Sequence, residues 1–171
     1  MIIKDNLLTR TERNKLKSSI RGIYHSDDEE LFDIVLTRYS SGVVTLKTAL
    51  SFYNLIDAWI EAPYDIVFQT GYRKIDDSRI NQYRDDKDLL LLGAAQQEHN
   101  QTSFLIYNRE RLLIELWRKE KYISQDVYKE AIFSYRKLAN SGELNIPLIR
   151  EYISKMPKSN IYKKRLSTEV L

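Results

Sequence analysis

The sequence predicts an α+β fold, with a small mixed β-sheet flanked by helices and a helical C-terminal third. Three apolar stretches typical of strands, residues 64–70, 88–97 and 102–107, lie in the middle of the chain. Segments with helical periodicity precede and follow these stretches and do not alternate with them. This segregation favours α+β over a parallel α/β arrangement.

Capping patterns predict the elements before the sheet. A Ser or Thr followed three residues later by Glu is a capping box, and it occurs at Thr9 and again at Ser26. An extended pair, Val43 and Val44, precedes Thr45, a further helix cap. The predicted elements are a helix over 10–17, a short strand over 20–24, a helix over 27–39 and a helix over 46–56.

The sheet region is predicted from its hydrophobic patterns. Residues 64–70 alternate apolar and polar side chains, which indicates a half-buried strand. The polar, charged stretch 75–87 is predicted to be a surface loop. Residues 88–97 are apolar without alternation, as in a central strand covered on both faces. They are expected to pair with 102–107 as a hairpin through a tight connection at 99–101.

Helices fill the rest of the chain. Asn108 is predicted to cap a helix whose inward face holds Leu112, Leu113, Leu116 and Trp117. Further helices are predicted over 125–139, capped by Ser124, over 146–156, stopped by Pro157, and over 160–170, which is basic.

Length and composition indicate one ordinary globular domain. The chain has 171 residues, 43% hydrophobic and 30% charged, and no cysteine, which excludes disulfides, thiolate metal sites and cysteine nucleophiles. No apolar run is long enough for a signal peptide or a membrane span. We therefore expect a cytoplasmic protein that does not contact a membrane.

Charge is unevenly distributed along the chain. Residues 1–25 hold six Lys or Arg against two acids, as do residues 147–171, so each end carries +4. The total of +3 leaves −5 for the middle (3 − 8). Basic ends on an acidic body suit contact with nucleic acid or with an acidic partner, and solvated helix faces are the plainer interpretation.

Signs of catalysis are sparse. The two histidines, His25 and His99, each lie beside turn-forming residues with no second His at ligand spacing, so both are predicted to be surface residues. There is no P-loop, G-x-G-x-x-G or G-x-S-x-G motif, and no cofactor is expected. One catalytic alternative is a metal-dependent nuclease, in which Asp65 and Asp85 would hold Mg²⁺ and Lys87 would stabilise developing charge.

The residues resemble a known family at several points. These points include Arg21 to Tyr24, Gly42 to Thr45 and Gly71 to Arg73, and the sharpest is Ile106-Tyr-Asn-Arg-Glu-Arg111 with Leu113 and Glu115. The chain is similar here to the AbiEi antitoxins, whose signature is I-Y-D-R-E-R-x-x-x-D. Asn108 and Glu115 replace the two aspartates, and both substitutions keep the local chemistry of a helix cap and a carboxylate. The family-motif residues are Tyr107, Asn108, Arg109, Glu110, Arg111 and Glu115.

The resemblance implies a non-enzymatic antitoxin that counteracts a nucleotidyltransferase-like toxin in an abortive-infection (type IV) toxin–antitoxin system, and so contributes to phage resistance. Such antitoxins carry an N-terminal winged helix-turn-helix that binds their own promoter. Here only one short helix fits before Arg21, so residues 1–25 are expected to form a truncated, vestigial winged-helix-like segment. Residues 26–171 are expected to form the antitoxin domain.

Two surfaces are candidates for binding. The basic turn and following loop are expected to be exposed and to contact the toxin through Tyr72, Arg73, Lys74, Arg79, Tyr83 and Arg84. Tyr162 is a further surface aromatic flanked by cations. The alternative function is transcriptional autoregulation, in which promoter DNA would be bound by Arg10, Arg13, Lys15, Lys17 and Arg21. The oligomeric state and the toxin's target do not follow from the sequence.

Overall fold

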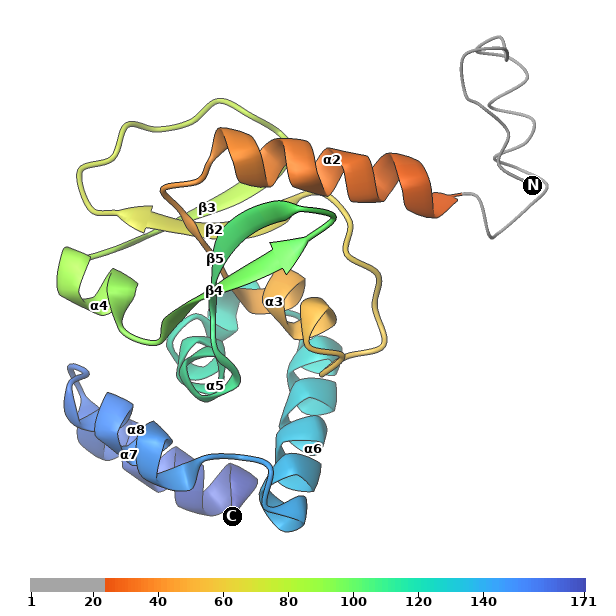
Figure 1. The fold of residues 1–171 in the computed structure, drawn as a ribbon. Coiled ribbons are helices and arrows are strands. Elements are labelled where there is room, and N and C mark those ends of the chain that lie inside the picture. The colour runs from red at the N-terminus through yellow and green to blue at the C-terminus, as the bar shows by residue number, and fades with distance from the viewer. Residues whose placement is uncertain (1–23) are drawn as a thin grey trace, which may run out of the picture.

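A five-stranded mixed sheet forms the centre of the protein (Figure 1). The computed structural model describes the backbone of residues 24–171 and the side chains from Glu30 onward. The strands are β1 (Val43–Val44), β2 (Tyr64–Gln69), β3 (Ile80–Asp85), β4 (Ala94–His99) and β5 (Thr102–Tyr107). The helices are α2 (Tyr24–Arg38), α3 (Leu46–Phe52), α4 (Lys87–Leu91), α5 (Arg109–Arg118), η2 (Glu120–Tyr122), α6 (Gln125–Ser141), α7 (Ile146–Ser154), α8 (Ser159–Arg165) and η3 (Leu166–Val170). This confirms the predicted α+β class.

The shortest strand, β1, lies in the middle of the sheet. The strand order is β3-β2-β1-β5-β4, so β1 joins two pairs of longer strands. Val43 pairs with Val67 of β2 in antiparallel register and with Leu105 of β5 in parallel register. The outer pairs differ in direction, because β2 and β3 run parallel whereas β4 and β5 form an antiparallel hairpin. The sheet is therefore mixed, as predicted.

Helices cover both faces of the sheet. On one face Phe32 of α2 packs against Tyr64, with ring centroids 5.0 Å apart, and against Phe104 of β5. On the other face, Thr48 of α3 accepts a hydrogen bond from the Asp65 backbone N–H at 2.9 Å. Successive strand residues point to opposite faces of a sheet. Because helices cover both faces here, every β2 residue up to Phe68 is buried. The expectation of a half-buried strand was wrong, because β2 carries a polar alternation and yet has helices on both sides.

The predicted surface loop over residues 75–87 contains a strand. Residues 80–85 form β3, which pairs in parallel register with all of β2, from Tyr64 opposite Ile80 to Gln69 opposite Asp85. The polar side chains of β3 are satisfied within the sheet: Asn81 and the Tyr83 hydroxyl both donate to Asp65. Apart from Ile80 and Tyr83 the strand is polar, so it has no hydrophobic alternation for a pattern to detect.

The prediction of a central strand over residues 88–97 was also wrong. Its leucine run forms the short helix α4, in which Leu90 is buried while Leu91 is 54% exposed. Gly93, at φ +74°, ends this segment, and β4 follows as an edge strand with three exposed residues. Short apolar runs fit a buried strand and a helix equally well by periodicity. The predicted hairpin is confirmed, with Asn100 and Gln101 at positive φ in its turn.

Two helices before the sheet have different ends from those predicted. Helix α2 begins at Tyr24, so Ser26 lies inside it and does not cap it. Helix α3 ends at Phe52, four residues early, because Asn54 adopts a left-handed conformation at φ +53°. The Leu55 N–H then bonds to the Leu50 carbonyl at 2.8 Å, as in a Schellman motif. The helix predicted over 10–17 and residues 20–23 of the strand predicted over 20–24 lie outside the described residues, whereas Tyr24, the last residue of that predicted strand, begins α2.

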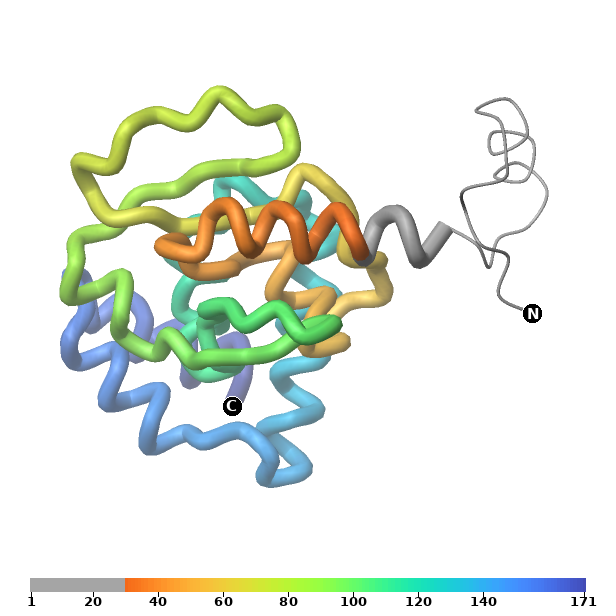
Figure 2. Tube along the Cα trace, turned by 45° about the horizontal axis from the view of Figure 1, so that its top comes forward, coloured from red at the N-terminus to blue at the C-terminus, as the bar shows by residue number. Residues whose placement is uncertain are grey.

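The C-terminal helices are confirmed. Asn108 and Ser124 cap α5 and α6 through their side chains, and Gly142 ends α6 at φ +77°. Helices α7, α8 and η3 occupy the two stretches predicted to be helical and lie below the sheet (Figures 1 and 2). In the part of the chain that the structure describes, no helix combines the length and apolar character needed to cross a membrane.

Candidate functional site

Stacked side chains support the start of the connection between β2 and β3. Gly71, at φ +87°, turns the chain away from β2, and the Tyr72 N–H bonds to the Gln69 carbonyl at 3.0 Å. The Tyr72 ring stacks on Phe68, with centroids 4.9 Å apart and an interplanar angle of 21°. Since Phe68 is fully buried, this contact anchors Tyr72 to the core and leaves part of its ring exposed.

Arg84 supports the same turn from the neighbouring strand. Its guanidinium lies 5.4 Å from the Phe68 ring centroid and donates to the backbone oxygen of Arg73 at 3.2 Å. It also donates to the Gln82 side-chain oxygen at 2.9 Å, and Gln82 in turn bonds to the backbone of Ile75. The backbone that carries Arg73 and Lys74 is thereby tied to β3.

A second anchor fixes the end of the connection. The Arg79 side chain donates to both oxygens of Asp77, at 2.9 and 2.7 Å, and the Tyr39 hydroxyl of the α2–β1 connection donates to Asp77 at 2.6 Å. The hydrogen bond from Arg79 holds the pKa of Asp77 well below its ordinary value. Burial, followed by the hydrogen bond to Asp77, raises the pKa of Tyr39.

The six predicted contact residues therefore fall into two groups. Tyr72, Arg73 and Lys74 are exposed, as predicted, and neither cationic side chain pairs with an acid among the described residues. The prediction of exposure was wrong for the other three, Arg79, Tyr83 and Arg84, which are half-buried and bonded within the chain. We call Tyr72, Arg73 and Lys74 the exposed turn; it lies in the connection between β2 and β3.

Most of the motif around Tyr107 is buried beneath the sheet. Tyr107 ends β5, Asn108 caps α5, and both Arg111 and Glu115 are completely inaccessible to solvent. The Arg111 guanidinium lies over the Tyr107 ring, 4.7 Å from its centroid, and one nitrogen is 3.3 Å from the Met156 sulfur. Arg111 and Glu115 can therefore affect a partner only through the surfaces that they position.

Arg111 and Glu115 belong to a cluster of five charged side chains, of which four are buried and Arg118 is half-buried. Arg118 binds both oxygens of Asp85 at 2.6 and 2.8 Å, and it also donates to Glu115. Lys119 donates to the second Glu115 oxygen at 2.6 Å. We call Asp85, Arg111, Glu115, Arg118 and Lys119 the buried charge cluster; its three cations outnumber its two carboxylates. The cluster joins the end of β3 to α5, and Arg111 extends it towards α7.

The cluster keeps its carboxylates ionised. Burial alone would raise the pKa of Glu115, but the charges of Arg111, Lys119 and Arg118 outweigh it and lower this pKa. At Asp85, burial also raises the pKa, but the hydrogen bond from Arg118 and the charges of the neighbouring cations lower it by more. The pKa of Asp85 therefore ends below its ordinary value. Taking either partner away would leave a charge buried without compensation.

The other motif residues attach the C-terminal helices. The Glu110 carboxylate accepts from the Asn145 N–H at 3.2 Å, where α7 begins. The Arg109 carbonyl accepts from the Tyr135 hydroxyl of α6 at 2.8 Å. Asn108 accepts from the Arg111 N–H at 2.9 Å and donates to the Tyr152 hydroxyl of α7 at 3.0 Å. The motif thus joins the sheet to α6 and α7.

The residues of the nuclease alternative lie apart. Asp65 sits opposite Asn81, four positions along β3 from Asp85, and Lys87 is exposed on α4. Burial raises the pKa of Asp65, partly offset by hydrogen bonds from Asn81 and Tyr83, whereas Asp85 is bound by Arg118. In the described part of the chain no group of three or more His, Cys, Asp or Glu residues is placed to hold a metal ion.

The remaining predicted residues are placed as follows. His99 is half-buried, not a surface residue, because its Nδ1 lies 2.8 Å from Asp33 and its ring meets Phe32 edge-on. Tyr162 is also half-buried and stacks parallel to Trp117 at 6.4 Å. The side chain of His25 and the residues predicted to bind DNA, Arg10, Arg13, Lys15, Lys17 and Arg21, lie outside the side chains that the structure describes.

The buried charge cluster was not predicted from the sequence. Arg111, Glu115, Arg118 and Lys119 are spaced three and four residues apart, a pattern that places them on one side of a helix. That spacing could have indicated the cluster, although Asp85 comes from a strand that the hydrophobic pattern did not predict.

Fold and site together define an α+β protein with a buried charge cluster and an exposed turn that is supported by neighbouring side chains. No protein-family model matches the chain, and no curated protein matches it.

Proposed function

We propose that the protein is an antitoxin that neutralises a nucleotidyltransferase-like toxin of an abortive-infection system by binding it. The observation that carries the proposal is the exposed turn, in which Tyr72, Arg73 and Lys74 are presented to solvent on a support from β2 and β3. The resemblance of the motif around Tyr107 to the AbiEi antitoxins supplies the partner's class.

The chemistry of the exposed turn suits a protein interface. Tyrosine and arginine are enriched among the residues that contribute most to binding energy. The stack of Tyr72 on Phe68 and the hydrogen bond from Arg84 to the Arg73 carbonyl hold the backbone before a partner arrives. A turn that is already ordered loses less conformational entropy on binding, so more of the contact energy appears as affinity.

Charge around the turn adds selectivity. Asp76 is exposed two residues after Lys74, and Asp86 and Asp88 are exposed where β3 leads into α4. A basic nucleotide-binding site on a toxin would meet these carboxylates, while Arg73 and Lys74 would pair with acids at its rim. Such complementary charges speed association and disfavour wrong partners more than they add affinity.

The test is rescue of growth by co-expression with the product of the neighbouring reading frame, which the proposal expects to be a nucleotidyltransferase-like toxin. The double variant Arg73→Glu with Lys74→Glu should weaken rescue, and it should not elute with the toxin in size-exclusion chromatography. Its melting temperature should stay at the wild-type value, because neither side chain has a partner in the described part of the chain.

A charge-matched control separates the turn from net charge. Lys129→Glu with Lys137→Glu changes the same number of charges on exposed positions of α6 and should leave rescue intact. If the Arg73 and Lys74 variant rescues as well as wild type, the exposed turn is not the contact surface. If the wild-type protein neither rescues nor forms a complex, the antitoxin function itself is rejected.

A further inference from the structure

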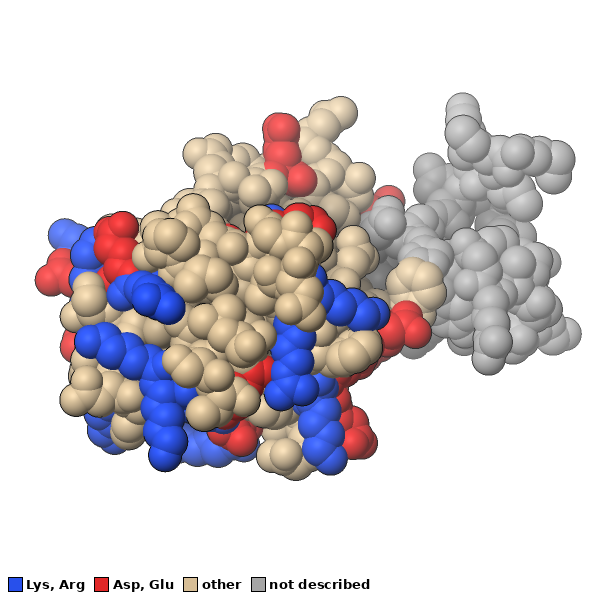
Figure 3. Space-filling view, turned by 90° about the horizontal axis from the view of Figure 1, so that it is seen from below, with Lys and Arg blue, Asp and Glu red and all other residues tan. Residues whose placement is uncertain are grey.

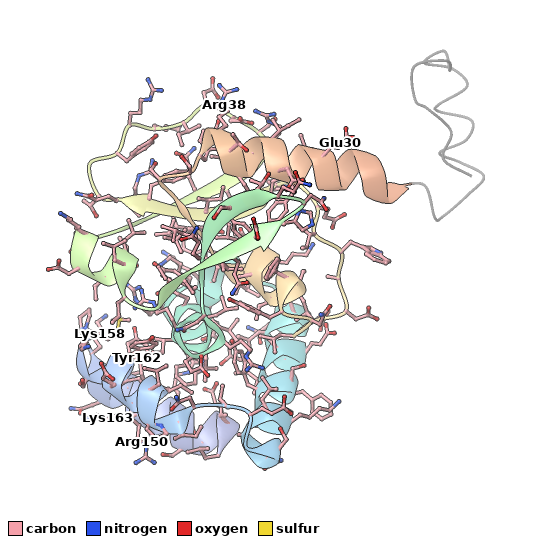
Figure 4. The ribbon with its side chains drawn as sticks, in the orientation of Figure 1. Glu30, Arg38, Arg150, Lys158, Tyr162 and Lys163 are labelled. Atoms are coloured by element: carbon pink, nitrogen blue, oxygen red, sulfur yellow. The ribbon has the colours of Figure 1, made fainter. Side chains whose placement is uncertain are left out.

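Helices α7 and α8 and the turn between them carry four cations that have no acidic partner among the described residues. Arg150 lies on α7, Lys158 on the turn between the helices, and Lys163 and Lys164 on α8; all four are exposed. None of them lies within ion-pair distance of an acid among the described residues. Figure 3 shows Lys and Arg side chains spread over this face, and Figure 4 shows Arg150, Lys158 and Lys163 along the same pair of helices. We call these four residues the α7–α8 surface.

The nearby charges do not neutralise this surface. Glu151, the sole acid between Ile146 and Arg165, is bound by Lys155 at 2.6 Å. Arg165 forms ion pairs with Glu169 and Glu120, at 2.7 and 2.9 Å. The four remaining cations therefore project an uncompensated positive field, which attracts polyanions.

Two features that the α7–α8 surface lacks indicate which kind of partner it can bind. A protein interface needs an apolar centre, and the large exposed apolar side chain within these two helices is Ile161, 53% exposed. A single-stranded nucleic acid needs rings on which bases stack, but the Tyr162 ring is already stacked on Trp117. Phosphate groups need neither, because Lys and Arg bind them by charge and hydrogen bonds.

The surface is also rigid enough to act as a platform. Ile149 and Ile153 of α7 and Leu166 after α8 are buried in the core. Trp117 donates to Glu169 at 3.1 Å, which fixes η3 beyond α8. Helices α7 and α8 lie against each other, so neither stands out as a helix that could enter a groove (Figure 1). Such a surface contacts phosphates without reading bases.

We propose that the α7–α8 surface binds the phosphate backbone of double-stranded nucleic acid independently of sequence. This site is formed by other residues than the exposed turn, so it neither requires nor excludes the antitoxin function. It also differs from the N-terminal residues considered as a DNA-binding segment, because its cations come from the last third of the chain.

The test measures binding of fluorescent 20-base-pair duplexes of two unrelated sequences over a range of salt concentrations. With four phosphate contacts, the slope of log K against log salt should be about −3.6, and the affinity should fall roughly 100-fold between 50 and 200 mM salt. The two sequences should bind equally. Duplex DNA and duplex RNA are measured separately to identify which of the two is preferred, and single strands should bind more weakly than either.

Matched variants locate the site. Arg150→Gln with Lys158→Gln and Lys163→Gln should reduce affinity at 50 mM salt at least roughly tenfold and bring the slope to about −0.9, with an unchanged melting temperature. Arg38→Gln with Lys87→Gln and Lys129→Gln removes the same charges from exposed positions on α2, α4 and α6 and should bind like wild type. Wild-type affinity in the first variant, no binding of wild type at 50 mM salt, preference for single strands, or equal competition by polyglutamate would each overturn the proposal.

Discussion

Arg111 and Glu115 face each other across one turn of α5, with Nη2 and Oε1 2.8 Å apart and neither side chain accessible to solvent. The pair lies at the centre of the buried charge cluster, which fastens β3 to the helices below the sheet. In an interior of low dielectric, removing one charge of an ion pair costs more stability than removing one charge of an equally short pair at the surface. The stability of the protein should therefore respond strongly to single changes here.

Glu115→Gln keeps the shape of the side chain and removes its charge, leaving three cations around a single carboxylate. We expect the free energy of unfolding to fall by about 3 kcal/mol or more, as for other broken buried pairs. Glu151→Gln is the control, since it removes a carboxylate from the exposed pair with Lys155 and should cost less than about 0.5 kcal/mol. Urea titration of both variants measures the difference, and equal small losses would contradict a stabilising cluster.

Acid should destabilise the protein through the same cluster. The pKa values of Asp85 and Glu115 are lowered in the folded state from ordinary values of 3.8 and 4.5. Their stabilising contribution is therefore complete above these ordinary values and is lost as pH falls below them. The free energy of unfolding should decrease steeply below pH ~4. In Glu115→Gln this slope should be shallower, whereas Glu151→Gln should keep the wild-type slope in urea titrations from pH 7 to 3.

The cap of α5 should tolerate one replacement and not another. Asn108→Ala removes the acceptor of the Arg111 N–H and the donor to the Tyr152 hydroxyl, and should cost about 1 to 2 kcal/mol. Asn108→Asp restores the acceptor, so most of that loss should be recovered in thermal unfolding. An aspartate variant as unstable as the alanine variant would show that the bond to Tyr152, not the cap, carries the effect.

Two glycines at positive φ should differ in what a methyl group costs. A Cβ at Gly93 would lie 2.5 Å from the Arg111 Cβ, whereas a Cβ at Gly71 would meet nothing within 4 Å. Gly71→Ala should cost about 1 kcal/mol of backbone strain, and Gly93→Ala clearly more. The comparison of their melting temperatures isolates the steric part, and similar values would mean that Arg111 can move aside.

Local chemistry explains which elements the sequence predicted well. Helices α5 and α6 begin at side-chain caps, Asn108 and Ser124, and α6 ends at Gly142, so their limits follow from a few neighbouring residues. Strand β3 could not be found this way. Asn81, Tyr83 and Asp85 share one face of the strand and are polar, and only Asp85 is fully buried; their partners, Asp65 and Arg118, lie far away in the sequence.

The same distinction applies to the candidate site. Gly71 followed by polar and basic residues predicted the exposed turn correctly, because a glycine turn out of a strand is a local property. That Arg84 would support this turn from beneath depended on the pairing of β2 with β3, which the pattern did not include. The motif around Tyr107 was singled out in the sequence for its resemblance to a family, yet only the packing shows that Arg111 and Glu115 are inaccessible to solvent.

The two-residue strand β1 has a consequence for how the protein is made. Val43 and Val44 are synthesised early, but one of their two neighbours, β5, ends at Tyr107. During translation the sheet therefore cannot close until well over half of the chain has left the ribosome. Until then one edge of β1 lacks its neighbour, and a chaperone that shields this edge would guard the nascent protein against aggregation.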